Sequence, residues 1–268
     1  YKPGFVQLQL DRFECQKKLG VAPKNAVLRN QAGSWKKLST QQKNTWMRTM
    51  ATYAAMIEIM DDGIGQLIDM LKKNGQYEDT VIVFLSDNGS TPERKNVGAN
   101  LCASLSNTPF SGVKAQTLEG GISSPFIFSW PKKLAKYGGQ IRHGHSHIID
   151  VLPTCLEATG VRFPDSFSGI TPKKPDGVSL MDAMRGKDLE KRSFFWEHGR
   201  SCAVYQDGWK LVAQRAPWKL FDLNNDPVEQ SDLSKEYPEN VASLKALWEK
   251  WGRKYDVIPF PRSKKSGK

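Results

Sequence analysis

The side chains best suited to chemistry follow a short apolar run at residues 80–85. Asp87 supplies a carboxylate and Asn88 an amide carbonyl, and both are hard oxygen donors of the kind that calcium and magnesium prefer. In open α/β sheets, binding sites gather at the carboxyl ends of strands, where these two residues are expected. The pattern indicates a metal site, although an ordinary Asp-Asn-Gly turn is the commoner outcome for such a sequence.

Lys114 is the second candidate for chemistry. It follows Gly112 and precedes Glu119-Gly120-Gly121, so a glycine-rich loop would present its ammonium as a point charge for an oxyanion. The alternative is a solvated surface lysine, which is the usual fate of this residue type. For Glu119 we favour a structural role, in which its carboxylate anchors backbone donors of the loop.

Three of the four histidines, His143, His145 and His147, alternate along one segment and suggest a metal site. They would share a face only in an extended segment, and Asp150 is the one carboxylate near them. We interpret them as loop residues, with a structural contact between His147 and Asp150. The fourth, His198, stands beside a glutamate at the expected end of a strand.

The element before the metal candidates reads as a long helix. Apolar residues recur at spacings of three and four over residues 41–73, which predicts an amphipathic helix whose apolar stripe belongs to the core. Ser39 and Thr40 offer its N-cap, and Asn74-Gly75 its end. A shorter helical stretch is expected over residues 5–18.

The run at residues 80–85 predicts a strand. Because it is continuously apolar, we expect it to be buried on both faces in a parallel sheet between helices. Residues 125–131 predict another strand, and Asp150 opens a helix with Pro153 in its first turn. The fold class indicated is α/β, with a mixed or parallel sheet flanked by helices.

After Arg192 the pattern changes to short strands separated by turn residues such as Asp207-Gly208. An amphipathic helix is expected over residues 238–254. We therefore predict two domains: residues 1–190 as part of the α/β domain, and residues 191–268 as a small antiparallel sheet with a covering helix. The expected strands of this sheet lie at residues 194–197, 203–205, 209–213 and 218–222.

Composition excludes several classes of protein. With 39% hydrophobic and 25% charged residues the chain is globular, and no apolar run approaches the roughly 18–20 residues that span a bilayer. The net charge of +11 comes from scattered lysines and a basic tail at residues 262–268, so we expect an anionic substrate and no nucleic-acid partner. The four cysteines form no CxxC pair, which argues against structural zinc. No charged and apolar leader opens the sequence, so no signal peptide is visible.

The order of these motifs resembles the arylsulfatase family, the formylglycine-dependent sulfatases of the alkaline-phosphatase-like superfamily. The similarity covers nearly the whole chain. Phe84-Leu85-Ser86-Asp87-Asn88-Gly89 resembles the family's metal-binding strand end, and Lys114 with Glu119-Gly120-Gly121 resembles its second signature. Residues 53–65 resemble the family's long helix, and residues 147–154 resemble one of its helix starts. Residues 196–198, 208–212 and 218–223 resemble its C-terminal subdomain.

The resemblance implies an alkaline-phosphatase-like fold and hydrolysis of a sulfate monoester, carried by a carbohydrate or an aryl compound. Asp87 and Asn88 would ligate Ca²⁺, and Lys114 would be the catalytic cation on a sulfate oxygen. Asn88, Lys114 and His198 would bind the substrate, a sulfated small molecule or glycan. A periplasmic or secreted location is also implied. The alternatives are a phosphodiesterase or phosphonate hydrolase of the same superfamily, and a non-catalytic module that binds a sulfated ligand.

The sequence departs from the family at the nucleophile. The family uses a Cys or Ser in a Cys/Ser-x-Pro-x-Arg motif, oxidised to formylglycine, and none of Cys15, Cys102, Cys155 and Cys202 has that context. The family's N-terminal Asp-Asp metal ligands also lack a counterpart, because Asp61-Asp62 falls inside the expected helix. We expect the missing groups upstream of this chain, and no turnover from the chain alone.

Overall fold

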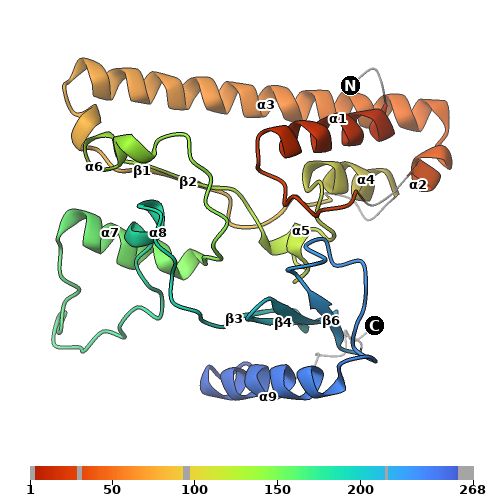
Figure 1. The fold of residues 1–268 in the computed structure, drawn as a ribbon. Coiled ribbons are helices and arrows are strands. Elements are labelled where there is room, and N and C mark those ends of the chain that lie inside the picture. The colour runs from red at the N-terminus through yellow and green to blue at the C-terminus, as the bar shows by residue number, and fades with distance from the viewer. Residues whose placement is uncertain (1–3, 29–31, 93–96, 215–216, 259–268) are drawn as a thin grey trace, which may run out of the picture. The chain divides into compact units, whose positions relative to one another are not determined.

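The computed structural model describes residues 4–28, 32–92, 97–214 and 217–258 (Figure 1). The basic tail at residues 262–268 lies outside the described residues. The chain forms two compact units. The first comprises Tyr1–Ala55, Asn88–Ser124 and Arg192–Lys268, and the second comprises Met56–Asp87 and Pro125–Lys191. The predicted domain boundary between residues 190 and 191 stays a prediction.

The longest helix, α3 (Thr40–Lys73), begins and ends where the pattern indicated. Ser39 Oγ accepts a hydrogen bond from the Gln42 N–H, and Gln42 Oε1 accepts one from the Ser39 N–H, which forms a capping box. At the other end Gly75 adopts a left-handed conformation, with φ of 69°, and ends the helix.

The apolar stripe of α3 is only partly core, and the prediction that it belongs to the core is wrong for its second half. Met50 is buried in the first unit, in a cluster with residues of α1 (Phe5–Lys18) and α4 (Val97–Ser106), which lie side by side (Figure 1). Further along, Ile57, Met60 and Leu67 are exposed. Helical period identifies a face that can be covered. It does not specify what covers that face.

In the second unit, the apolar run forms β1 (Ile82–Leu85), which pairs with β2 (Phe126–Ser129). The pairing is antiparallel, so the expectation of parallel pairing is wrong for these two strands. All four residues of β1 are half-buried, so the expectation of burial on both faces is also wrong for this strand. A continuous apolar run does not encode the direction of the neighbouring strand.

Short helices complete the second unit, and one of them confirms a predicted contact. Asp150 Oδ2 accepts a hydrogen bond from the His147 N–H at 2.8 Å, and His147 Nδ1 accepts one from the Ile149 N–H. Asp150 is fully buried, so this pair fixes the start of the helix. The short helices are η1 (Tyr77–Asp79), α6 (Pro131–Leu134), η2 (Ala135–Tyr137), η3 (Ile148–Asp150), α7 (Val151–Thr159) and α8 (Met181–Met184).

The C-terminal part of the first unit is the predicted sheet with its covering helix. The strands form an antiparallel meander, and the Asp207-Gly208 hairpin turn has positive φ at both residues, as a two-residue type I′ turn requires. Helix α9 (Pro238–Lys254) packs on the sheet (Figure 1). The strands are β3 (Phe194–His198), β4 (Ser201–Gln206), β5 (Trp209–Gln214) and β6 (Lys219–Asp222).

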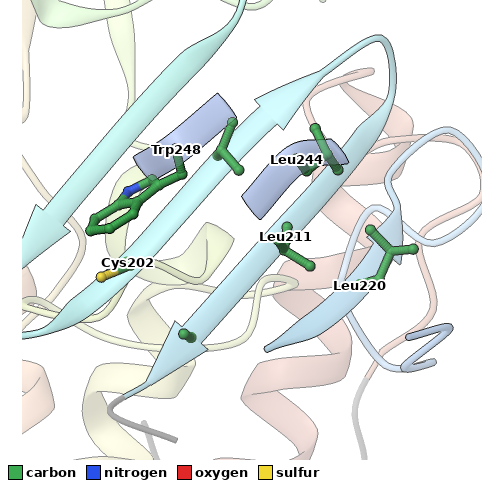
Figure 2. Packing of buried hydrophobic residues seen from close by; sticks show 7 residues of the cluster. Cys202, Leu211, Leu220, Leu244 and Trp248 are labelled. Atoms are coloured by element: carbon green, nitrogen blue, oxygen red, sulfur yellow. The ribbon is translucent and has the colours of Figure 1, made fainter. Parts of the chain in front are cut away.

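The core of this sheet lies under α9. Figure 2 shows Trp248 and Leu244 of the helix over Cys202, Leu211 and Leu220 of the strands. All five side chains are at most 4% exposed. The remaining described helices of the first unit are α2 (Ala32–Lys36) and α5 (Glu119–Ile122). Among the described residues, no helix has the length and the apolar character that crossing a membrane requires.

Candidate functional site

The segment with the metal candidates follows β1 directly, as predicted. Asp87 is exposed and Asn88 is half-buried. Asn88 Nδ2 donates a hydrogen bond to the Gly89 carbonyl oxygen at 3.0 Å. The amide nitrogen is thereby engaged, and the amide oxygen is the atom of this side chain that can ligate a cation.

Lys114 lies in the Lys114 loop, which we define as residues 111–121. This loop is hydrogen-bonded to the segment that carries Asn88: the Lys114 N–H donates to the Ser90 carbonyl oxygen and the Gly89 N–H to the Gly121 carbonyl oxygen, both at 3.0 Å. The side chain of Lys114 is exposed. The structure therefore brings the backbone of the predicted anion-binding lysine beside the segment that carries Asn88.

The glycines of both segments permit this close approach of backbone to backbone. A Cβ added at Gly89 would collide with the Gly120 carbonyl oxygen, and one added at Gly121 would collide with the Gln116 carbonyl oxygen. A side chain at Gly89 would force the two segments apart, and one at Gly121 would force apart the two sides of the Lys114 loop. Gly89 and Gly121 are thus required by packing, because no larger residue leaves room for the neighbouring backbone.

Glu119 makes a contact that the sequence did not reveal. Its Oε1 lies 2.6 Å from Lys210 Nζ, which also lies 2.8 Å from Glu229 Oε1. Glu229 Oε2 accepts a hydrogen bond from the Glu119 N–H at 2.7 Å. We call these three residues the ion triad. Glu119 does anchor the loop, but its carboxylate binds an ammonium from β5 and not the backbone donors that we expected.

The ion triad is buried. The side chains of Lys210 and Glu229 are fully buried, and that of Glu119 is 14% exposed. Burial opposes the charge of Lys210, but the carboxylates of Glu119 and Glu229 outweigh it and raise the lysine pKa. Burial also raises the pKa of Glu229, to about 7, and the neighbouring charge of Glu119 adds to the rise, while the Lys210 ammonium opposes it only in part. The sequence offered one signal of the ion triad, which is the position of Lys210 among apolar residues of a predicted strand.

His198 ends β3 in register with Ser201 on β4, and its side chain is exposed. Its contact with substrate stays a prediction. His143 and His145 are exposed loop residues in the second unit, as interpreted from the sequence.

The cysteines are free thiols, and two of them, Cys102 and Cys202, are buried. Burial raises the pKa of Cys102 to about 11 and that of Cys202 to about 12. A buried thiol with a raised pKa is a poor nucleophile. Cys155 is half-buried and Cys15 is exposed.

The donor set fits part of a calcium site. Asp87 offers a carboxylate and Asn88 an amide oxygen, whereas calcium takes about six to eight oxygen ligands. Within the ranges that the structure describes, no group of three or more His, Cys, Asp or Glu side chains could hold a metal. Asp87 and Asn88 can therefore contribute to a site that needs further oxygen ligands.

Comparison with known proteins adds independent findings. The family model described as Sulfatase matches residues 14–161. Over 97% of its length the chain is 29% identical to an uncharacterised sulfatase of Schizosaccharomyces pombe, and over 72% it is 29% identical to an arylsulfatase of Klebsiella aerogenes. These matches cover 54% and 47% of the two relatives, so the chain spans about half the length of the curated relatives it matches.

A solved structure is similar as well. The crystal structure of Ps i-CgsB in complex with k-i-k-neocarrahexaose matches 81% of this chain and 44% of its own, with a TM-score of 0.61 and 27% identity. This similarity confirms the predicted α/β fold class.

Proposed function

This chain belongs to the sulfatase family, and we propose that the protein carrying it hydrolyses sulfate monoesters, with Lys114 as the cation on the sulfuryl oxygens. The observation that supports this most directly is the pair of backbone hydrogen bonds that sets the Lys114 loop beside the Asn88 segment. Both segments carry groups that bind an anionic substrate, and the curated relatives described above are sulfatases.

Lys114 would act on charge that develops during the reaction. Its backbone is held by Ser90, while its side chain is exposed and can reach a ligand. An ammonium beside the sulfuryl oxygens stabilises the transition state more than the ground state, because negative charge grows there as the ester bond breaks. Asn88 would face the same sulfate group, and His198 would contact the rest of the substrate.

For the metal we propose calcium, held by the Asp87 carboxylate and the Asn88 amide oxygen. When bound, the cation draws charge from the sulfuryl oxygens. For the nucleophile we propose formylglycine from sequence outside this chain. None of the four cysteines is followed by x-Pro-x-Arg, and two of them are buried.

We propose a sulfated glycan as the substrate class. The complex of Ps i-CgsB with k-i-k-neocarrahexaose supports a carbohydrate. We also propose a secreted or periplasmic location, as the family resemblance implies.

Replacing Lys114 tests the proposed role. Lys114→Ala should lower kcat on an aryl sulfate by about 100- to 1,000-fold, the usual effect of removing one electrostatic donor. Lys114→Arg should restore part of this loss, because the planar guanidinium keeps the charge but differs in reach. Lys219→Ala, an exposed lysine of the same unit, is the control and should keep wild-type kcat. A loss below about threefold for Lys114→Ala, far short of an electrostatic donor, would make Lys114 an ordinary surface residue.

Replacing Asp87 tests the metal. Asp87→Ala removes the one carboxylate proposed as a ligand in this chain, so calcium affinity and activity should both be lost. Isothermal titration with calcium measures binding without reference to turnover. The matched control is Asp165→Ala, an exposed aspartate in a loop of the second unit. Wild-type calcium affinity in Asp87→Ala would exclude Asp87 as a ligand.

A further inference from the structure

We infer that Lys210 and Glu229 are positioning residues for Lys114, because they hold the base of the Lys114 loop through Glu119. The inference rests on the proposed function of Lys114. Neither residue contacts the sulfate in this proposal. They act on the reaction through the place that they give to another side chain.

The Lys114 loop has a closed geometry. The Gly120 N–H donates to the Ser111 carbonyl oxygen at 2.6 Å, which joins the two ends of the loop and leaves Lys114 between them. Glu119 directly precedes this closing hydrogen bond. Whatever fixes Glu119 therefore fixes the base on which Lys114 is carried.

The ion triad fixes Glu119 at two points. Lys210 Nζ binds the Glu119 carboxylate at 2.6 Å, and Glu229 Oε2 binds the Glu119 backbone N–H at 2.7 Å. Glu229 is itself held with φ of 57°, a left-handed conformation that is uncommon outside glycine. The side chain and the backbone of Glu119 are thus both bound by residues of the C-terminal part of the unit.

Hydrogen bonds between neutral groups also attach the Lys114 loop to the C-terminal part of the unit. Thr117 Oγ1 donates to the Cys202 carbonyl oxygen and accepts from Gln214 Nε2, both at 3.1 Å. Ser111 Oγ donates to the Val228 carbonyl oxygen, also at 3.1 Å. The loop is therefore attached at its start, its middle and its end to residues of the C-terminal part.

Burying the charges of the ion triad costs free energy, and a gain in folding stability alone does not explain why the triad is charged. Lysine is almost never fully buried unless it is paired, and well-packed hydrocarbon often stabilises such a position as well as ions do. Ion pairs, unlike hydrocarbon contacts, depend on distance and direction. Lys210 Nζ lies at hydrogen-bonding distance from both carboxylates. An anion-binding lysine needs that directional hold, because a displacement of about 1 Å near reacting atoms can cost about 100-fold in rate.

The test is a double-mutant comparison of Lys210→Met with Lys114→Ala, using kcat and KM of the full protein on an aryl sulfate. We expect Lys210→Met to lower kcat by about 100-fold with KM changed less than threefold. In the Lys114→Ala background the same change should lower kcat by less than about threefold, because the residue being positioned is already gone. Lys219→Met makes the same chemical change at an exposed position on β6 and should leave kcat unchanged.

A second variant keeps the test decisive where Lys210→Met does not fold. Glu119→Gln retains an oxygen for Lys210 and removes the charge that pins the loop. It should lower kcat by about 10-fold in the wild-type background, as expected when a charge-assisted hydrogen bond becomes a neutral one, and have no effect in Lys114→Ala. An equal loss of kcat in both backgrounds would mean general destabilisation and would overturn the inference.

Hydrogen exchange separates this inference from the proposed function. Backbone amides of residues 112–121 should exchange faster in Glu119→Gln than in wild type, and at the wild-type rate in Lys219→Met. If wild-type protein does not hydrolyse sulfate esters, the proposed function fails, whereas the exchange result still reports whether the triad holds the loop. Unchanged exchange in these amides would refute the positioning role even in an active enzyme.

Discussion

The two faces of the C-terminal sheet differ in the polar contacts that their side chains make. On one face Cys202, Leu211 and Leu220 lie under α9 and form a cluster of hydrocarbon (Figure 2). The other face combines Lys210 and Gln214 with a smaller apolar cluster of Ala203, Val212 and Phe221, against which Leu118 of the Lys114 loop packs. Lys210 and Gln214 belong to the same face because side chains two apart on a strand point the same way. Lys210 and Gln214 of this second face bind Glu119 and Thr117 of the Lys114 loop.

The difference separates two tasks within one sheet. Hydrocarbon packing is strong and non-directional, so it stabilises the sheet without fixing any one atom. Hydrogen bonds and ion pairs depend on distance and direction, so they fix where a loop lies. A change on the α9 face should therefore reduce stability, and a change on the face that binds the Lys114 loop should alter catalysis.

The largest expected effect on stability is on the α9 face. Trp248 is 3% exposed, and its Nε1 donates to the Trp196 carbonyl oxygen at 3.1 Å. Trp248→Ala should lower the free energy of unfolding by about 3–5 kcal/mol, because it leaves a cavity and removes a buried hydrogen bond. Urea unfolding followed by circular dichroism measures this change.

The same variant sharpens the comparison of the two faces. In Trp248→Ala, kcat per folded molecule should stay at the wild-type value, since α9 packs on the face of the sheet opposite to the one that binds the Lys114 loop. Lys245→Ala, an exposed site on α9, is the control and should change stability by less than about 0.5 kcal/mol, the usual worth of an exposed pair on a helix. A large drop in kcat of folded Trp248→Ala would contradict the division of tasks.

The sequence predicted the hydrocarbon face and the helices α1, α3, α7 and α9. Strand candidates with an Asp207-Gly208 turn, followed by an amphipathic helix, indicated an antiparallel sheet with a covering helix, which β3 to β6 and α9 form. These features depend on period and turn chemistry, which are local along the chain. The start of α3 was readable for the same reason, because Ser39 and Gln42 form a local capping box.

Features that depend on distant partners could not be read in this way. Glu119 lies 91 residues before Lys210 and 110 residues before Glu229, and no local pattern links them. Similarly, the apolar run of β1 did not specify an antiparallel partner, and the stripe of α3 did not specify what covers it. The sequence did indicate Asp87, Asn88 and Lys114, because each stands in a short motif.

The smaller expected effect concerns the ion triad and depends on pH. Burial raises the pKa of Glu229 from its ordinary value near 4.5 to about 7. Between these two values the folded protein keeps a proton that the unfolded chain has released. Stability therefore falls as pH rises through this window, since the folded state is the one that binds more protons. The loss is on the order of 3 kcal/mol at most.

Glu229→Gln removes this titration and isolates it from other groups. The groups that face Glu229 are Lys210 and Glu119, and Lys210 stays charged throughout because its pKa is raised. Urea unfolding at pH 5, 6 and 7 should show wild type losing stability relative to Glu229→Gln at each step upward. Glu236→Gln, an exposed glutamate, is the control and should follow wild type in parallel. If the difference between wild type and Glu229→Gln is constant from pH 5 to 7, the buried carboxyl does not titrate there. The face of the sheet that binds the Lys114 loop would then be as insensitive to pH as the hydrocarbon face under α9.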